Sequence, residues 1–187
     1  ALCGDGSSMV TEFIYWSDYY NSIISPFYSY STGRTKSTVR SSLTTCRDID
    51  GDGVIEIPKD ASNKKQASEI TTQNWVSYGN TVLSHKCYSL ACKRDGYILV
   101  VGDDDFSKIK ASYDSEKRKL ELTNKKNNKK AIEIITLINS SYSENDPKYE
   151  DYSLVMKNSG FVYLAKADSS SGIDINIKKL RDMIKVY

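Results

Sequence analysis

The stretch CRDIDGDGVIEIP, residues 46–58, decides how this sequence is interpreted. Counted from Asp48, oxygen-bearing side chains stand at positions 1, 3, 5 and 9, and Gly53 at position 6 permits a sharp turn. Calcium takes about six to eight oxygen ligands at roughly 2.3–2.6 Å, and alternating carboxylates on a tightly curled loop supply them. The stretch therefore predicts a calcium site with the ligands Asp48, Asp50, Asp52, the main-chain carbonyl of Val54, and Glu56.

The residues after the loop indicate which kind of calcium site this is. A helix-loop-helix site needs a carboxylate at position 12, where this sequence has Lys59. Ile55 and Ile57 alternate with Glu56, and Pro58 then ends a segment with the period of a strand. We therefore expect a β-hairpin around a structural Ca²⁺, and a plain Asp-Gly hairpin turn without metal is the alternative.

A strand, an Asp-rich loop and a second strand resemble the calcium-binding hairpins of FG-GAP/VCBS repeats, which build integrin-like β-propellers. The match is CRDIDGDGVIEIP, and CGDGSSMVTEFIYW, residues 3–16, is similar to a degenerate copy. The resemblance implies antiparallel sheets like propeller blades and the same ligand positions, with Glu56 in place of the more usual Asp. The chain also resembles the C-terminal end of Gram-positive surface lipoproteins. A closed propeller needs about four to eight blades, so the resemblance implies one or two blades of a longer exported chain.

The rest of the sequence predicts a mainly β protein with an α+β C-terminal part. The 14 Tyr and many Ser and Thr favour half-buried strands, and apolar segments recur at roughly ten-residue spacing between turn residues. Residues 59–73 are polar and predict a surface loop. We expect a β domain over 1–94 and a second domain over 95–187, which combines a small antiparallel sheet with a helix at 175–187. The apolar face of that helix is Ile177, Leu180, Ile184 and Tyr187.

The charge pattern argues against two classes of protein. With 26 Lys and Arg against 24 Asp and Glu, the net charge is +2, which is too small for general nucleic-acid binding. No apolar run approaches the roughly 20 residues that cross a bilayer, so we expect no transmembrane segment. Residues 108–130 hold nine Lys or Arg and three acids, which indicates a solvated sheet face or contact with an anionic polymer.

The four cysteines are compatible with two disulfides. Cys87 and Cys92 would bridge locally, and Cys3 and Cys46, which each precede an Asp-Gly turn, would pair through neighbouring strands. The alternative is that the cysteines are free buried thiols, as expected in a reducing environment. The sequence favours neither interpretation over the other. The single His85 lies two residues from Cys87, but no Gly turn of the oxyanion type stands beside it, so we expect no catalytic site.

These patterns predict a non-catalytic extracellular or cell-surface module, for binding or for structure, that is stabilised by calcium. Its partner would be an extracellular protein or a glycan, and the chain would be a monomer. A lipid anchor on the full-length protein is a further option. The alternative function is an accessory domain of a secreted enzyme or transporter, with the active site outside this chain or between its two domains.

Overall fold

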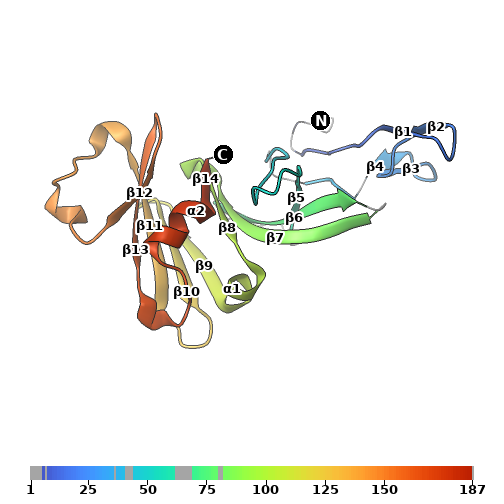
Figure 1. The fold of residues 1–187 in the computed structure, drawn as a ribbon. Helices are drawn as coiled ribbons and strands as arrows, with labels where there is room; N and C mark the ends of the chain where they lie inside the picture. The colour runs from blue at the N-terminus through green and yellow to red at the C-terminus, as the bar shows by residue number, and fades with distance from the viewer. Residues whose placement is uncertain are drawn as a thin grey trace. The chain divides into compact units, whose positions relative to one another are not determined.

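In a computed structural model of the chain, the described residues are 6, 8–35, 37–40, 44–61, 69–79 and 82–186. Within them the protein is mainly β, with antiparallel sheets and a short C-terminal helix, as expected (Figure 1). These residues form no closed barrel or propeller.

The elements of the first half are strands. They are β1 (Tyr15–Ser17), β2 (Ser22–Ile24), β3 (Tyr28–Ser29), β4 (Arg34–Thr35), β5 (Ile57–Asp60), β6 (Ile70–Gly79) and β7 (Val82–Cys92). The second half adds further strands and two helices: β8 (Tyr97–Val101), α1 (Asp103–Lys108), β9 (Ile109–Asp114), β10 (Lys119–Asn124), β11 (Lys130–Ile138), β12 (Ser153–Lys157), β13 (Phe161–Ala167), α2 (Ile177–Met183) and β14 (Ile184–Val186). Short 3₁₀ turns connect some of them, at Lys93–Asp95, Asn139–Ser141, Pro147–Tyr149 and Ser169–Ser171.

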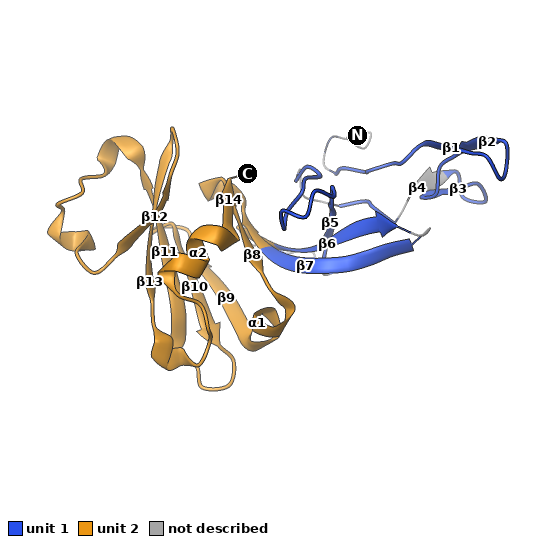
Figure 2. Ribbon diagram, in the orientation of Figure 1, with its two compact units in different colours: residues 1–65, 72–89 blue, residues 66–71, 90–187 orange. Residues whose placement is uncertain are grey.

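The chain divides into two compact units (Figure 2). Unit 1 comprises residues 1–65 and 72–89, and unit 2 comprises residues 66–71 and 90–187. The long strands β6 and β7 therefore contribute residues to both units. The domain division expected between residues 94 and 95 stays a prediction.

Unit 1 has a small aromatic core. Phe27, Ile57 and Val76 are buried, and the rings of Phe13 and Tyr78 pack against them. Phe13 stacks on Tyr78 with 5.4 Å between ring centroids, and Phe27 meets both rings edge-on. This core lies where β5 pairs with β6, because Ile57 is the register partner of Val76.

A buried chain of polar side chains also stabilises unit 1. The indole Nε1 of Trp75 donates to Ser89 Oγ at 2.8 Å, and Ser89 Oγ donates to Gln73 Oε1 at 3.3 Å. Gln73 Nε2 then donates to Thr44 Oγ1 at 2.6 Å. All four residues are buried, so each bond satisfies a group that would otherwise be desolvated without a partner.

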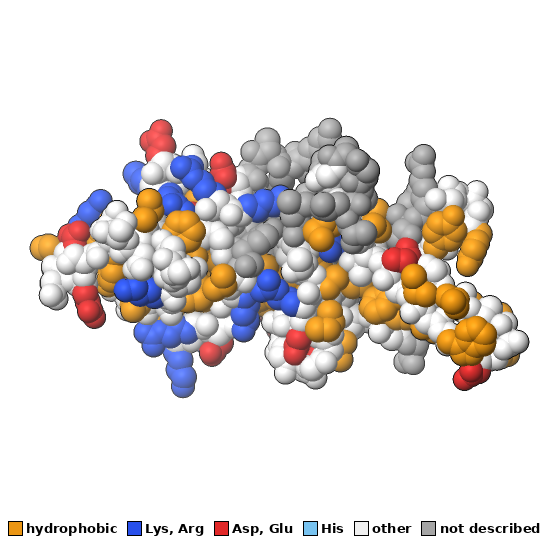
Figure 3. All heavy atoms as spheres, turned by 90° about the horizontal axis from the view of Figure 1, so that it is seen from above, with side chains coloured by type: hydrophobic (Ala, Val, Ile, Leu, Met, Phe, Trp, Pro, Cys, Tyr) orange, Lys and Arg blue, Asp and Glu red, His pale blue; other side chains and the backbone are white. Residues whose placement is uncertain are grey.

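Large apolar side chains are exposed on the two small hairpins of unit 1. Strands β1 and β2 form one hairpin and β3 and β4 the other. Tyr19 is 88% exposed, Tyr30 is 79% exposed and Trp16 is 57% exposed. The space-filling view shows hydrophobic side chains gathered over this part of unit 1 (Figure 3).

Unit 2 is built on a five-stranded antiparallel sheet of order β12-β13-β11-β10-β9. Its inner face carries Leu120, Leu122, Ile132 and Ile134, which pack in one core with residues of β8 such as Leu99. Because side chains alternate along a strand, Lys119, Glu121 and Glu133 project from the opposite face.

The C-terminal helix is shorter than the sequence predicts. Helix α2 begins after Asn176, whose Oδ1 accepts the N–H of Lys179 at 3.0 Å, and its Leu180 is buried in the core. It ends at Met183, because Ile184–Val186 form β14 and pair with β8. The helix expected over 175–187 is thus wrong in its last turn, and Tyr187 lies outside the described residues.

Neither α-helix in the described part of the chain has the length and apolar character that a membrane span requires.

Candidate metal centre

The Asp-rich loop is closed at its base by a pair of backbone hydrogen bonds. Arg47 N–H donates to the Glu56 carbonyl at 3.2 Å, and Glu56 N–H donates to the Arg47 carbonyl at 2.9 Å. Strand β5 follows directly at Ile57, and its residues pair with β6. A strand does follow the loop, as predicted, but not with the predicted bounds. The sequence pattern places it over residues 55–57 and ends it at Pro58, whereas β5 begins at Ile57, and Pro58 pairs with Trp75 within it.

The four acidic side chains of the loop converge. One carboxylate oxygen from each lies within 4.8 Å of the others, and the group consists of Asp48, Asp50, Asp52 and Glu56. Among the described residues, this is the one group of three or more Asp, Glu, His or Cys side chains placed closely enough to hold a metal ion together. The structure thus brings together every side-chain ligand that the sequence predicts.

Hydrogen bonds from the loop's own backbone fix its curvature. Asp48 accepts from Gly51 N–H at 2.6 Å and from Gly53 N–H at 2.9 Å, and Asp52 Oδ1 accepts from Val54 N–H at 2.8 Å. Gly51 and Gly53 have φ of +85° and +86°, which is the left-handed region that glycine adopts without a steric penalty. These bonds and the two glycine turns curl the loop so that its carboxylates converge.

Val54 is the residue whose main-chain carbonyl the sequence predicts as a metal ligand. Its N–H is used within the loop, while its side chain is exposed. Ligation through its carbonyl stays a prediction.

Glu56 differs from the three aspartates because it is buried. It is 0% exposed, and its Oε2 accepts the N–H of Ile49 at 3.0 Å. Its Oε1 is buried and has no hydrogen-bond partner among the described residues. Burial raises the pKa of Glu56, and the nearby charges of Asp50 and Asp52 also raise it, whereas the Ile49 bond opposes them. A buried acceptor without a partner costs about 1–3 kcal/mol, and more when it is charged.

One lysine from a distant strand already approaches the carboxylates. Lys86 of β7 places its Nζ 2.5 Å from Asp52 Oδ2 and 3.6 Å from Asp50 Oδ2. The hydrogen bond from Lys86 to Asp52 lowers the pKa of Asp52 and raises the pKa of Lys86. The one positive charge of Lys86 offsets only part of the negative charge that four ionised carboxylates carry. Sequence reasoning missed Lys86, because 34 residues separate it from Asp52 and no local spacing connects them.

The predicted bridge between Cys87 and Cys92 is wrong. Both residues lie on the continuous strand β7, where five residues span about 16 Å. A disulfide needs Cα atoms about 4.4–6.8 Å apart. Cys92 is a free thiol, and burial raises its pKa to about 12.

The second predicted bridge involves a residue beyond the described part of the chain. Cys46 is a free thiol in the structure, and its Sγ lies 3.1 Å from Thr11 Oγ1. A free Cys46 does not support the predicted bridge to Cys3, which itself lies outside the described residues. His85, the single histidine, places Nδ1 2.5 Å from Asn74 Oδ1 and packs its ring against Tyr88.

The four acidic side chains of the loop could hold a cation through oxygen ligands alone. They offer carboxylate oxygens and no nitrogen or sulfur ligand, which suits a hard cation such as Ca²⁺ or Mg²⁺ better than Zn²⁺. Comparisons of the chain with protein families, with curated proteins and with solved structures give no match, so the function of this loop is inferred from its own chemistry.

Proposed function

We propose that this chain is a non-catalytic extracellular binding or structural module in which Ca²⁺, held by the loop of residues 48–56, stabilises the β region. The observation that carries the proposal is the buried carboxylate of Glu56, one of four converging carboxylates, whose Oε1 has no hydrogen-bond partner within the described part of the chain. A cation at that point would satisfy the oxygen and offset the repulsion among the carboxylates.

Calcium fits this group better than magnesium. Magnesium demands a near-ideal octahedral shell and gives up its waters reluctantly, whereas calcium accepts irregular shells that mix carboxylates, carbonyls and water. Asp48, Asp50 and Asp52 already accept backbone bonds, so they would offer their remaining lone pairs in directions that the loop dictates. The loop is closed by an antiparallel bridge and is followed by a strand. This arrangement supports our proposal that the loop resembles the hairpins of FG-GAP/VCBS repeats.

The role of the ion would be structural. The carboxylates converge only when the hairpin is formed, so an ion that binds there stabilises the folded state by mass action. At a free calcium concentration about 100 times the dissociation constant, this linkage is worth about 2.7 kcal/mol. The effect belongs to unit 1, which contains the loop and Lys86.

Tryptophan fluorescence provides a test that reports on unit 1. Both tryptophans, Trp16 and Trp75, lie in that unit, and Trp75 is fully buried. In a Trp16→Phe background, thermal unfolding followed through Trp75 should shift upward with millimolar Ca²⁺, less with Mg²⁺, and return to its starting point with a chelator. An unfolding curve that is the same in calcium and in chelator would refute the proposal.

Two variants separate metal binding from simple loop stability. Glu56→Gln keeps the shape of the side chain and its bond from Ile49 N–H but removes a charge from the cluster. We expect it to be at least as stable as the parent protein in chelator and to lose most of the calcium shift. Asp104→Asn, on an exposed position of α1, is the matched control and should keep the full shift. If calcium raised the unfolding midpoint of Glu56→Gln as much as that of the control, the ion would have to bind at another site.

A further inference from the structure

A second site in unit 2 is formed by a pocket of about 550 Å³, separate from the metal loop in the sequence. It lies between the turn that joins β9 to β10, the C-terminal half of β11, and the segment from Asn139 to Tyr152. Its volume falls within the roughly 300–1,000 Å³ that small-molecule sites occupy.

The pocket combines an apolar floor with aromatic walls. Ile135 and Leu137 project from the outer face of the sheet, on the same side as Glu133, and both are half-buried. Tyr149 and Tyr152 come from the segment that follows β11, and their rings meet edge-on at 6.2 Å between centroids. Tyrosine offers both a flat apolar ring and a hydroxyl group, so such walls suit a ligand that is apolar on one side and polar at its edges.

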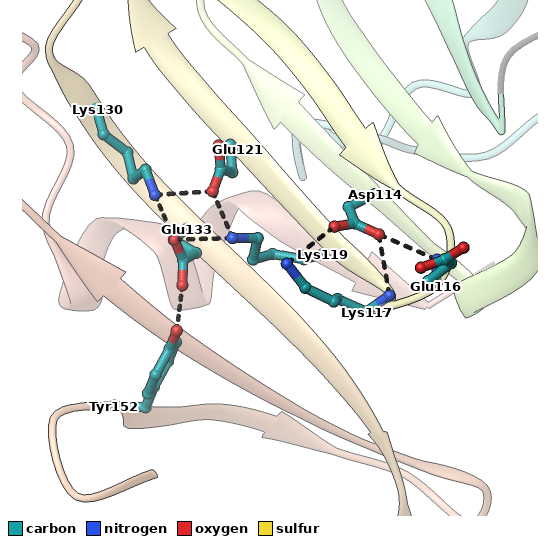
Figure 4. A network of polar contacts seen from close by, with 8 residues as sticks. All are labelled: Asp114, Glu116, Lys117, Lys119, Glu121, Lys130, Glu133 and Tyr152. Atoms are coloured by element: carbon teal, nitrogen blue, oxygen red, sulfur yellow. Dashed lines mark hydrogen bonds and ion pairs between the residues drawn. The ribbon is translucent and has the colours of Figure 1, made fainter. Parts of the chain in front are cut away.

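The wall formed by Tyr152 is held in place by a network on the sheet (Figure 4). Its hydroxyl donates to Glu133, and Lys130 Nζ lies 2.6 Å from the other oxygen of that carboxylate. Lys119 Nζ bridges Glu121 at 2.6 Å and Glu133 at 3.5 Å. Two lysines and two glutamates thus neutralise one another, which makes this part of the pocket rigid but leaves it without a net charge to attract a ligand.

Two further cations of the pocket, Lys117 and Lys148, have exposed side chains. Arg118 is occupied, because its Nε lies 2.7 Å from an oxygen of the fully buried Asp95. Lys117 approaches Asp114 only at 3.6 Å, and its side chain is 71% exposed. Lys148 is exposed and lies 5.3 Å from the centroid of the Tyr149 ring, without an ion pair among the described residues.

We propose that this pocket binds a small anionic saccharide. The CH face of a sugar ring would pack against the apolar floor and Tyr149, and its carboxylate or phosphate would be held by Lys117 and Lys148. The polar network and the tyrosine hydroxyls would bond the ring hydroxyls. This inference rests on the binding role proposed above, but every residue that lines the pocket belongs to unit 2 and not to the calcium loop.

The test is a titration of the isotope-labelled full chain followed by amide NMR shifts. The probes are glucuronic acid and glucose 6-phosphate, which separate a carboxylate source from a phosphate source, and glucose as the neutral comparison. We expect saturable shifts over residues 133–152 with at least one anionic probe, and about tenfold weaker binding of glucose. The titration is carried out in calcium and in chelator, so a failure of the metal proposal does not affect its outcome.

Variants with matched charge give the decisive comparison. Lys148→Ala should weaken binding of the anionic probe by about tenfold, since one charge-assisted contact is lost. Lys126→Ala removes the same charge from the turn between β10 and β11, outside the pocket, and should leave binding unchanged. Both side chains are exposed, so the melting curves of the two variants should coincide with that of the parent protein. The proposal is overturned by equal binding of glucose and the anions, by the absence of saturable shifts, or by equal losses in the two variants.

Discussion

Replacing Glu133 by Gln is a sharp test of the charged network on the outer face of the sheet. The change keeps the size of the side chain and removes its charge. Burial acts to raise the pKa of Glu133, but the hydrogen bonds from Lys130 and Tyr152 and the charges of Lys130 and Lys119 outweigh it and lower the pKa to about 2. The folded state therefore favours the ionised carboxylate over the protonated one.

The size of the effect follows from that pKa. The interval from the ordinary value of 4.5 to about 2 is worth about 3 kcal/mol, at roughly 1.36 kcal/mol per pH unit. Because the pKa is lower in the folded state, this stabilisation is complete above pH 4.5 and is lost as the pH falls towards 2. We expect Glu133→Gln to cost about 3 kcal/mol at pH 7 and only about 1 kcal/mol at pH 3.

Urea unfolding at pH 7 and at pH 3 measures how much Glu133→Gln lowers the free energy of unfolding at each pH. Far-UV circular dichroism and hydrogen exchange of the β11 amides are the suitable signals, because Trp16 and Trp75 both report on unit 1. Glu116→Gln is the matched control, since that side chain is exposed on the adjacent turn and its loss should change stability by less than about 0.5 kcal/mol. A cost for Glu133→Gln that equals the control, or that is the same at both pH values, would refute the reasoning.

Two further predictions concern unit 1. Lys86→Met should tighten calcium binding by about tenfold, as measured by calorimetry, because the ammonium that now contacts Asp52 no longer competes with the ion; weaker binding in the variant would contradict this. Ser89→Ala should destabilise unit 1 by about 1–3 kcal/mol in chelator, followed by Trp75 fluorescence, because it leaves the indole N–H of Trp75 buried without its acceptor. An unchanged unfolding midpoint would show that water or another group replaces the hydroxyl.

The features that could be predicted from the sequence are those encoded in neighbouring residues. The convergence of Asp48, Asp50 and Asp52 depends on alternation and on two glycines within one loop. A strand after the loop could also be predicted, but its bounds could not, because β5 begins at Ile57 and continues through Pro58, where the pattern predicts its end. The presence of α2 follows from the apolar period that begins at Ile177, although the helix starts there and not at residue 175. None of these predictions requires knowledge of which distant residues contact the segment.

The features that could not be predicted depend on residues distant in the sequence. Residues 59–73 are polar and predict a loop, yet residues 59–60 belong to β5 and residues 70–73 to β6. Gln73 is buried in β6 because it finds partners in Thr44 and Ser89. The last residues of the expected helix form a strand, because β8 offers them an edge to pair with. The approach of Lys86 to the loop likewise depends on the placement of β7, which local spacing does not encode.

The division of β6 and β7 between the two units has a consequence for any attempt to truncate the protein. A fragment that begins at residue 95, where the sequence pattern changes, would retain β8 but lose Ile70, Leu90 and Cys92, which are buried in the core of unit 2. A fragment that ends at residue 94 would carry those apolar side chains exposed to water instead. Expression of either half alone should therefore yield less soluble protein than expression of the whole chain, whereas a cut made between β5 and β6 would divide neither long strand.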